Sequence, residues 1–182
     1  MRFSYVSPLD AADAVTRAGA DYLDVPMQGV LQGETPDEAW SAPAKASLPL
    51  PLEAGAGMLP AHLRVVGPER DEAALKQYVQ RLAQRGAQLG MHVLVFGSGP
   101  ARHCGDATDR QRAWEQIIAF VRMAGDVLGE HGIALAVEHL TRAETDMING
   151  LDELAALLDE ANHPNVGALI DAYHLALEDQ PI

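Results

Sequence analysis

His92-Val93-Leu94-Val95-Phe96 is the stretch of sequence that indicates the fold most directly. It is almost entirely apolar, and Gly90 and Gly97 on either side favour turns. An unbroken apolar strand predicts burial on both faces, because a strand with one solvated face would alternate apolar and polar residues. Such strands are typical of parallel sheets covered by helices. The sequence therefore indicates an α/β protein.

Similar strand-like runs recur along the chain, each followed by a helical pattern. Six such units in 182 residues give about 30 residues per unit, the size of a βαβ repeat. Two architectures use this series, the open doubly wound sheet and the eight-fold barrel. No G-x-G-x-x-G fingerprint follows the first strand, so the barrel is favoured. The predicted strands are Phe3–Val6, Tyr22–Val25, Pro49–Ala54, His92–Phe96, Ile133–Val137 and Val166–Ile170.

The helical segments carry recognisable boundary signals. After Asp71, apolar residues recur at helical spacing until Gly90 ends the pattern. Thr108-Asp109-Arg110-Gln111 resembles a capping box and predicts the start of the next long helix. Asn149 is expected to cap a helix over Leu151–Ala161. We therefore expect residues 1–182 to form a single (β/α) barrel domain, truncated after the sixth strand.

Composition and charge exclude several classes of function. A net charge of −13 repels phosphate backbones, so nucleic acid is not an expected partner. Cys104 is the single cysteine and cannot form an intramolecular disulfide. No apolar run approaches the roughly 20 residues needed to cross a bilayer, and the N-terminus lacks the pattern of a signal peptide. A cytoplasmic protein without a membrane partner is expected.

Two acidic residues end neighbouring predicted strands. Glu138 follows Ile133–Val137, and Asp171 follows Val166–Ile170. The carboxyl ends of barrel strands form the active-site rim, so both carboxylates are expected on it. A divalent cation would offset their mutual repulsion, which predicts a site for Mg²⁺ or Mn²⁺, with Co²⁺ or Zn²⁺ admitted if imidazole joins. Alternatively, each carboxylate caps a helix or pairs with an arginine, Arg102 or Arg142.

Other polar residues are expected on the same rim. His174 follows Asp171 by three residues and is a candidate to hold a substrate hydroxyl or carbonyl oxygen. Arg142 and Glu144 lie in the loop after the Glu138 strand, where they either contact substrate or form a solvated ion pair. The remaining histidines, His139 among them, have no placement that separates them from structural residues.

These motifs together resemble a known family. The run Val137-Glu138-His139-Leu140-Thr141-Arg142-Ala143-Glu144-Thr145, followed by His163-Pro164-Asn165-Val166 and Asp171-Ala172-Tyr173-His174, is similar to the sugar phosphate isomerase/epimerase family of xylose isomerase-like TIM barrels. The resemblance implies that Glu138 is both a metal ligand and an acid/base carboxylate, and that Asp171 is a second ligand. It also implies that His174 and Glu144 touch substrate oxygens and that Arg142 supports the loop. The family usually has Asn where this chain has Thr141, a departure that is expected to alter the substrate but not the metal.

The resemblance implies a metal-dependent isomerase or epimerase that acts on a small sugar or hydroxy-keto acid through an enediolate. Two alternatives stay open: a lyase of the same family that dehydrates a cyclic polyol, and a non-catalytic binding protein built on an incomplete barrel. An abasic-site endonuclease on the same fold would need a basic face, which the charge of −13 does not provide.

The family pattern extends beyond the end of this sequence. Family members complete the metal site with a His and a second catalytic Glu from the seventh and eighth strands, whereas this chain ends at Ile182. A barrel that lacks two strands leaves open edges. The expectation is a fragment of a longer chain, completion by another subunit in a homo-oligomer, or a degenerate relative.

Overall fold

The computed structural model describes residues 1–44 and 47–179 of the chain. Short 3-10 helices cover Leu9–Ala11 and Gly105–Ala107. The strands are β1 (Leu23–Pro26), β2 (Leu52–Ala56), β3 (Val93–Phe96), β4 (Ala134–Glu138) and β5 (Val166–Leu169). The α-helices are α1 (Ala12–Arg17), α2 (Met27–Leu31), α3 (Glu72–Leu89), α4 (Gly99–Arg102), α5 (Arg110–Gly129), α6 (Leu151–Ala161) and α7 (Ala172–Leu177).

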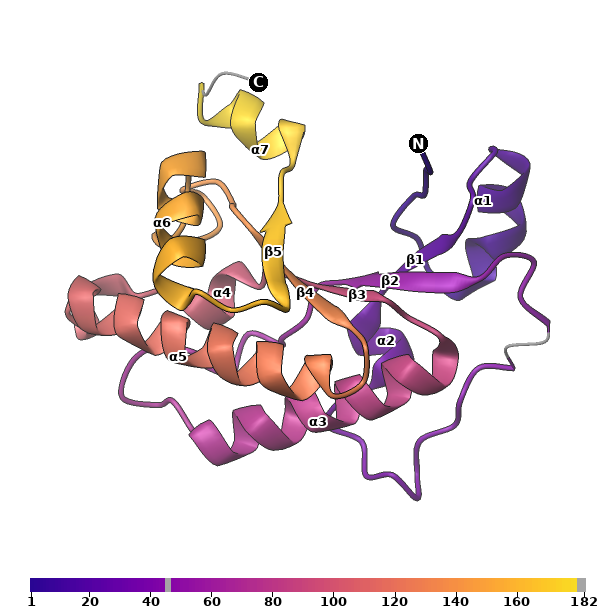
Figure 1. Ribbon diagram of the computed structural model, residues 1–182, viewed down its shortest axis with the longest axis horizontal. Helices are drawn as coiled ribbons and strands as arrows, with labels where there is room; N and C mark the ends of the chain where they lie inside the picture. The colour runs from indigo at the N-terminus through magenta and orange to yellow at the C-terminus, as the bar shows by residue number, and fades with distance from the viewer. Residues whose placement is uncertain (45–46, 180–182) are drawn as a thin grey trace.

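The five strands form one parallel sheet in the order β1-β2-β3-β4-β5. Each strand therefore lies beside the next one along the chain, as in a (β/α) barrel, and no strand order reverses as it would in a doubly wound sheet. The sheet twists strongly, so that β5 stands nearly upright in Figure 1 where β2 lies nearly horizontal. This order confirms the predicted barrel architecture over the open sheet.

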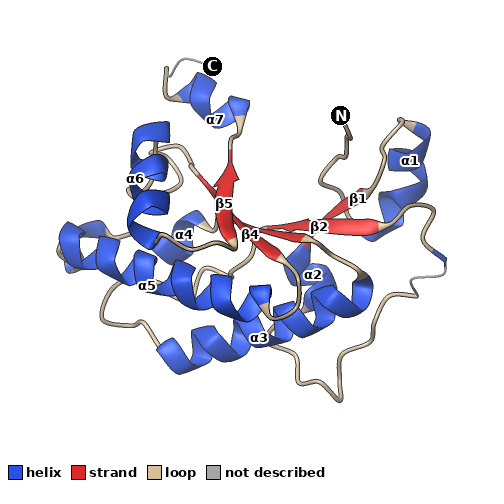
Figure 2. Ribbon diagram, viewed as in Figure 1, coloured by secondary structure: helices blue, strands red, loops and turns tan. Residues whose placement is uncertain are grey.

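Helices cover the outer face of this curved sheet. Helices α2, α3 and α5 lie below the strands in Figure 2, and α6 lies beside β5. Helix α3 packs against α5, which in turn packs against β4 and α6. Strand β3 shows why its sequence is so apolar: Leu94, Val95 and Phe96 are all buried, and the Phe96 ring lies 4.8 Å from that of Phe120 on α5.

The helix boundaries follow the predicted signals with two corrections. At α6 the N-cap residue is Gly150 and not Asn149, the residue expected from sequence. Asp71 caps α3 by accepting a hydrogen bond from the Ala74 amide at 2.9 Å, and Gly90 ends that helix with a φ of 85°. At the start of α5 the cap is Asp109, which accepts from the Arg112 amide, and not Thr108 as the capping-box pattern suggested. Thr108 is still extended, with φ −138° and ψ 137°, one residue too early to cap.

The predicted first strand, Phe3–Val6, is wrong for most of its length. Only Val6 pairs with the sheet, through one isolated parallel bridge to Asp24. Phe3, Tyr5 and Val6 are each more than half exposed. The physical reason is that this segment has a strand neighbour on one side only. Its apolar side chains are therefore little buried, and they do not stabilise a continuous set of backbone hydrogen bonds to β1.

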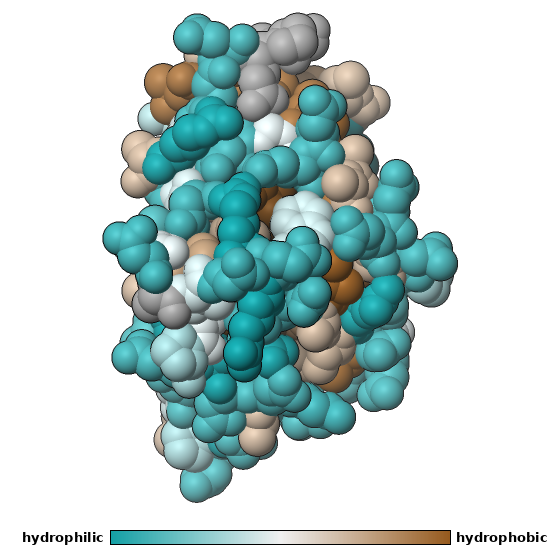
Figure 3. All heavy atoms as spheres, turned by 90° about the vertical axis from the view of Figure 1, so that its left-hand side faces the viewer, coloured by the Kyte–Doolittle hydropathy of each residue, from teal (hydrophilic) through white to brown (hydrophobic). Residues whose placement is uncertain are grey.

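The surface that faces left in Figure 1 is predominantly hydrophilic, as Figure 3 shows, in keeping with the high charge of the chain. Across the described residues, no helix is both long enough and apolar enough to span a membrane.

A half-buried carboxylate lies on the inner face of the sheet. Leu23 and Val25 of β1 point into the core, each 1% exposed, so Asp24 between them faces the opposite side. Its Oδ1 atom is buried and has no hydrogen-bond partner within the described part of the chain. Burial raises the pKa of Asp24 from 3.8 to about 6, although a hydrogen bond with the Val25 backbone opposes this shift.

The raised pKa of Asp24 predicts that its ionisation lowers the stability of the fold as pH rises. The folded pKa of about 6 exceeds the ordinary value of 3.8, so the folded state binds the proton more tightly, and stability falls as pH rises through this window. We expect Asp24→Asn to increase the free energy of unfolding at about pH 7 and to change it much less at about pH 4. Urea unfolding at both pH values measures the effect, and an equal change at both would contradict the assignment.

Candidate active site

Strand alternation brings Glu138 and Asp171 together. Leu135 and Val137 of β4 are buried against the helices, so Glu138 at the end of the strand faces the inner side. In the parallel register Glu138 is the partner of Leu169 on β5. Asp171 lies two residues beyond Leu169 and returns to the same side as Leu169. The two carboxylates therefore meet at the carboxyl edge of the sheet.

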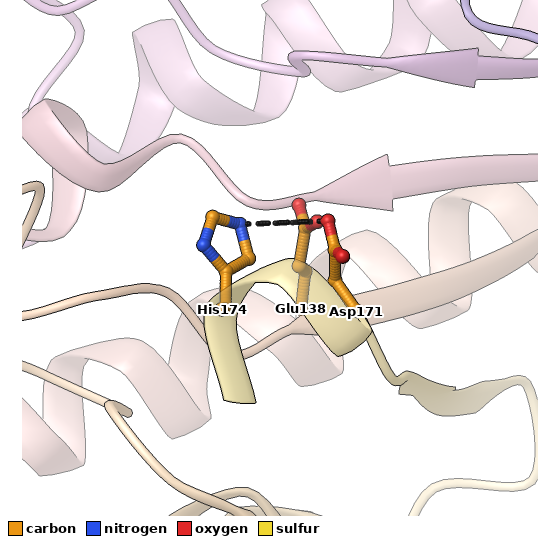
Figure 4. Close-up of side chains that lie close together, drawn as sticks. All are labelled: Glu138, Asp171 and His174. Atoms are coloured by element: carbon orange, nitrogen blue, oxygen red, sulfur yellow. Dashed lines mark ion pairs between the residues drawn. The ribbon is translucent and has the colours of Figure 1, made fainter. Parts of the chain in front are cut away.

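His174 completes a compact cluster with these carboxylates. Its Nε2 atom lies 3.7 Å from Glu138 Oε1 and 3.7 Å from Asp171 Oδ2. Figure 4 shows the imidazole facing both carboxylates from the first turn of α7. One donor atom from each of the three residues lies within 4.8 Å of the others, and the described residues contain no further group of this kind.

The two carboxylate oxygens of Asp171 make different contacts. It is the N-cap residue of α7, and its Oδ1 accepts a hydrogen bond from the Tyr173 amide at 2.8 Å. The other oxygen, Oδ2, faces His174. The helix-capping alternative considered from sequence is thus present, but it occupies one oxygen and leaves the second directed into the cluster. Capping also fixes the rotamer of the carboxylate.

Glu138 approaches the backbone after β3 so closely that a side chain there would collide with it. A Cβ atom built on Gly97 would overlap Glu138 Oε2, and one on Gly99 would lie 2.8 Å from the Glu144 carbonyl oxygen. The glycines of Gly97-Ser98-Gly99 therefore serve close approach as well as the turn expected from sequence. Gly97 is the residue that leaves room for the Glu138 carboxylate.

Glu144 is held at the edge of the cluster by its own loop. Its Oε2 accepts hydrogen bonds from the Thr141 hydroxyl at 2.8 Å and from the Thr141 amide at 3.2 Å. The same oxygen lies 3.4 Å from His174 Nδ1. Asn149 braces the loop by donating its side-chain amide to the carbonyl oxygens of Leu140 and Thr145, both at 2.9 Å. Thr141 therefore positions Glu144.

Arg142 lies outside the cluster. Its guanidinium forms an ion pair with Glu178 at the end of α7, and its side chain is 71% exposed. The Arg142 amide also donates to Glu178 Oε1 at 2.7 Å. These contacts tie the loop after β4 to the end of α7. The ion pair between Arg142 and Glu144 considered from sequence is replaced by this pair.

The charges around Glu138 oppose one another. Burial raises the pKa of Glu138, and nearby Asp171 and Glu144 act in the same direction, whereas His174 and Arg102 favour the ionised form. Arg102 is completely buried, and burial lowers its pKa to about 10. Its hydrogen bonds go to the carbonyl oxygens of Phe96 and Ile148 at 3.4 and 3.5 Å. Arg102 therefore acts on Glu138 through its charge.

Sequence reasoning treated His139 as structural, yet the structure places it against the cluster. It is completely buried, and its ring packs edge-on to His174 with centroids 5.9 Å apart. Burial lowers the pKa of His139, and the charge of His174 acts in the same direction. Its position immediately after Glu138 is the signal in the sequence, because neighbouring residues at a strand end lie close to the same edge of the sheet.

Comparison with known proteins places this geometry in a family context. L-Ribulose 3-epimerase of Methylomonas sp. (strain DH-1) is 30% identical over 174 residues, which cover 93% of this chain and 58% of that protein. D-Psicose 3-epimerase of Ruminiclostridium cellulolyticum is 28% identical over 110 residues, covering 59% of this chain and 37% of its own length. The chain thus spans little more than half the length of the L-ribulose 3-epimerase.

Solved structures agree on the fold. The crystal structure of a D-allulose 3-epimerase from Methylomonas sp. superimposes with a TM-score of 0.74 at 25% identity, covering 93% of this chain and 58% of that one. A 3-keto-D-glucoside 4-epimerase from E. coli gives the same TM-score at 18% identity, over 98% of this chain and 69% of that one. The family described as xylose isomerase-like TIM barrel matches residues 12–182. The chain therefore belongs to the xylose isomerase-like TIM barrel family, as the sequence motifs predicted.

Proposed function

We propose that this chain carries the carboxylate side of a divalent-metal site for the isomerisation or epimerisation of a small sugar. The observation that carries the proposal is the cluster of Glu138, Asp171 and His174, with donor atoms within 4.8 Å of one another at the carboxyl edge of the sheet. In this fold the active site lies at that edge. Curated relatives named L-ribulose 3-epimerase and D-psicose 3-epimerase support ketoses as the substrate class.

The donor set fits a divalent cation. Glu138 and Asp171 offer carboxylate oxygens, which suit Mn²⁺ or Mg²⁺, and a nearby imidazole also admits Co²⁺ or Zn²⁺. Asp171 and Glu144 raise the pKa of Glu138 beyond the effect of its burial. A cation held between them would reverse this repulsion and keep both carboxylates ionised. We therefore assign Glu138 and Asp171 as metal ligands.

The proposed chemistry is proton transfer at the carbon next to a carbonyl group. Glu138 removes that proton as general base, and burial raises the pKa of this carboxylate, which strengthens it as a base. A bound divalent cation would stabilise the negative charge that develops on the substrate oxygens. Epimerisation then needs an acid on the opposite face of the carbon. This role would fall to a residue beyond the cluster described here.

We assign substrate contact to two further side chains. His174 Nδ1 lies 3.4 Å from Glu144 Oε2, beside the carboxylates of Glu138 and Asp171. Both side chains offer polar atoms to a sugar hydroxyl or carbonyl oxygen. Thr141 holds Glu144 in this position through two hydrogen bonds. Arg142, which pairs with Glu178, contributes by fixing the loop that carries Glu144. A substrate panel tests the class, since loss of water from a cyclic polyol without ketose turnover would indicate a dehydratase.

The metal assignment predicts the effect of neutralising either ligand. We expect Glu138→Gln and Asp171→Asn each to weaken Mn²⁺ binding at least about tenfold, because each removes a charged oxygen donor. Glu130→Gln and Asp159→Asn change the same residue types at exposed positions away from the cluster and should leave binding unchanged. Equilibrium binding followed by the electron paramagnetic resonance of free Mn²⁺ measures the difference. Equal binding by all four variants would contradict the site.

The close approach at Gly97 predicts a second loss of metal binding without any change of charge. Gly97→Ala places a methyl group where the Glu138 carboxylate now lies, so the carboxylate must move. We expect Mn²⁺ affinity to fall about tenfold or more, as for other changes that displace a ligand. Gly29→Ala is the matched control, since its Cβ would meet no atom within 4 Å. Comparable affinity in both variants would sink this prediction.

A further inference from the structure

His139 lies beneath the cluster, on the side away from the inner face. It follows Glu138 directly, and successive side chains of a strand point to opposite faces. The His139 side chain therefore points toward the helix-covered core, whereas Glu138 points to the inner face. The residue is 0% exposed. Its contacts therefore define what it does.

One contact joins His139 to the start of α7. The Asp171 amide donates a hydrogen bond to His139 Nε2 at 3.3 Å, which links residues 32 positions apart in the chain. Asp171 is the N-cap of α7, and the amides at a helix start have no partner inside the helix. His139 therefore satisfies the N-cap amide, while the Asp171 side chain satisfies the Tyr173 amide.

This hydrogen bond fixes the tautomer of the ring. Nε2 accepts, so it carries the lone pair, and the single proton of the neutral ring must lie on Nδ1. Nδ1 is buried and has no hydrogen-bond partner among the residues that the structure describes. The arrangement thus leaves one polar atom of a buried ring unsatisfied while the other holds the Asp171 backbone. Such an arrangement costs stability and needs a compensating role.

We propose that His139 is a positioning residue, a neutral Nδ1-protonated imidazole that holds the Asp171 backbone and so sets where Asp171 meets Glu138. The inference rests on the proposed function, in which these two carboxylates bind the metal. The ring also packs edge-on against His174, at 77° and 5.9 Å between centroids. One buried side chain therefore adjoins all three members of the cluster: it follows Glu138 in the chain, bonds Asp171 and packs on His174.

The first test uses the unaltered chain and needs no metal. Nitrogen-15 correlation spectra of the imidazole groups distinguish the two neutral tautomers, and His139→Gln identifies which signals belong to His139. We expect the Nδ1-protonated form at neutral pH, in contrast to the exposed His131, whose ring is free to adopt the other tautomer. An Nε2-protonated His139 could not accept from Asp171 and would overturn the proposal.

The second test measures the Asp171 amide directly. His139→Leu removes the acceptor, so hydrogen exchange of the Asp171 amide should accelerate about tenfold, the order expected for loss of one hydrogen bond. His139→Gln should restore protection, because the glutamine carbonyl oxygen can accept where Nε2 does. His131→Leu, an exposed histidine, is the control for a general effect. Equal exchange in the Leu and Gln variants would refute the positioning role.

Metal binding separates this inference from the proposed function. Residues that support a metal ligand typically affect affinity by about 10- to 100-fold, so His139→Leu should weaken Mn²⁺ binding and His139→Gln should largely preserve it. If the unaltered chain binds no Mn²⁺, the proposed function fails, yet the tautomer and exchange results still decide the role of His139. If Mn²⁺ binds and His139→Leu leaves its affinity unchanged, the positioning role is rejected.

Discussion

The parallel pairing of β4 with β5 is the constraint on which the candidate site depends. It sets Glu138 opposite Leu169, and the alternation of side chains then returns Asp171 to the same inner face two residues later. A slip of one residue in this register would turn one carboxylate into the core. The burial of Leu135 and Val137 against the helices makes such a slip costly. The packing of the outer face therefore determines which side chains point to the inner face.

Around this register, small local features place the carboxylates. Gly97 supplies the space for Glu138, and Thr141 holds Glu144 through its hydroxyl and amide. Asp171 uses one oxygen to cap α7, which fixes the other toward His174. None of these supporting contacts comes from a charged partner. These three contacts place the carboxylates without neutralising them, and the charges of His174 and Arg102 favour the ionised form of Glu138.

The β5 edge of the sheet is open to solvent. Gly167 and Ala168 of β5 are exposed, and Ile170, Tyr173 and Leu177 beyond them are each more than half exposed. At the other edge the segment before β1 makes a single bridge to the sheet. The chain spans 58% of the L-ribulose 3-epimerase that it matches. The described cluster is thus a site formed by two adjacent strands and the helix that follows them.

The sequence by itself determined the α/β class, the barrel order, the limits of the long helices and the two strand-end carboxylates. These follow from local rules, because periodicity and capping depend on neighbours in the chain. Only the tertiary structure decided that Phe3–Val6 is not a strand, that Arg142 pairs with Glu178, and that His139 holds the Asp171 backbone. These features depend on contacts between residues far apart in the chain. Which polar groups form hydrogen bonds or ion pairs there depends on how the folded chain buries them, and residue type alone does not predict this.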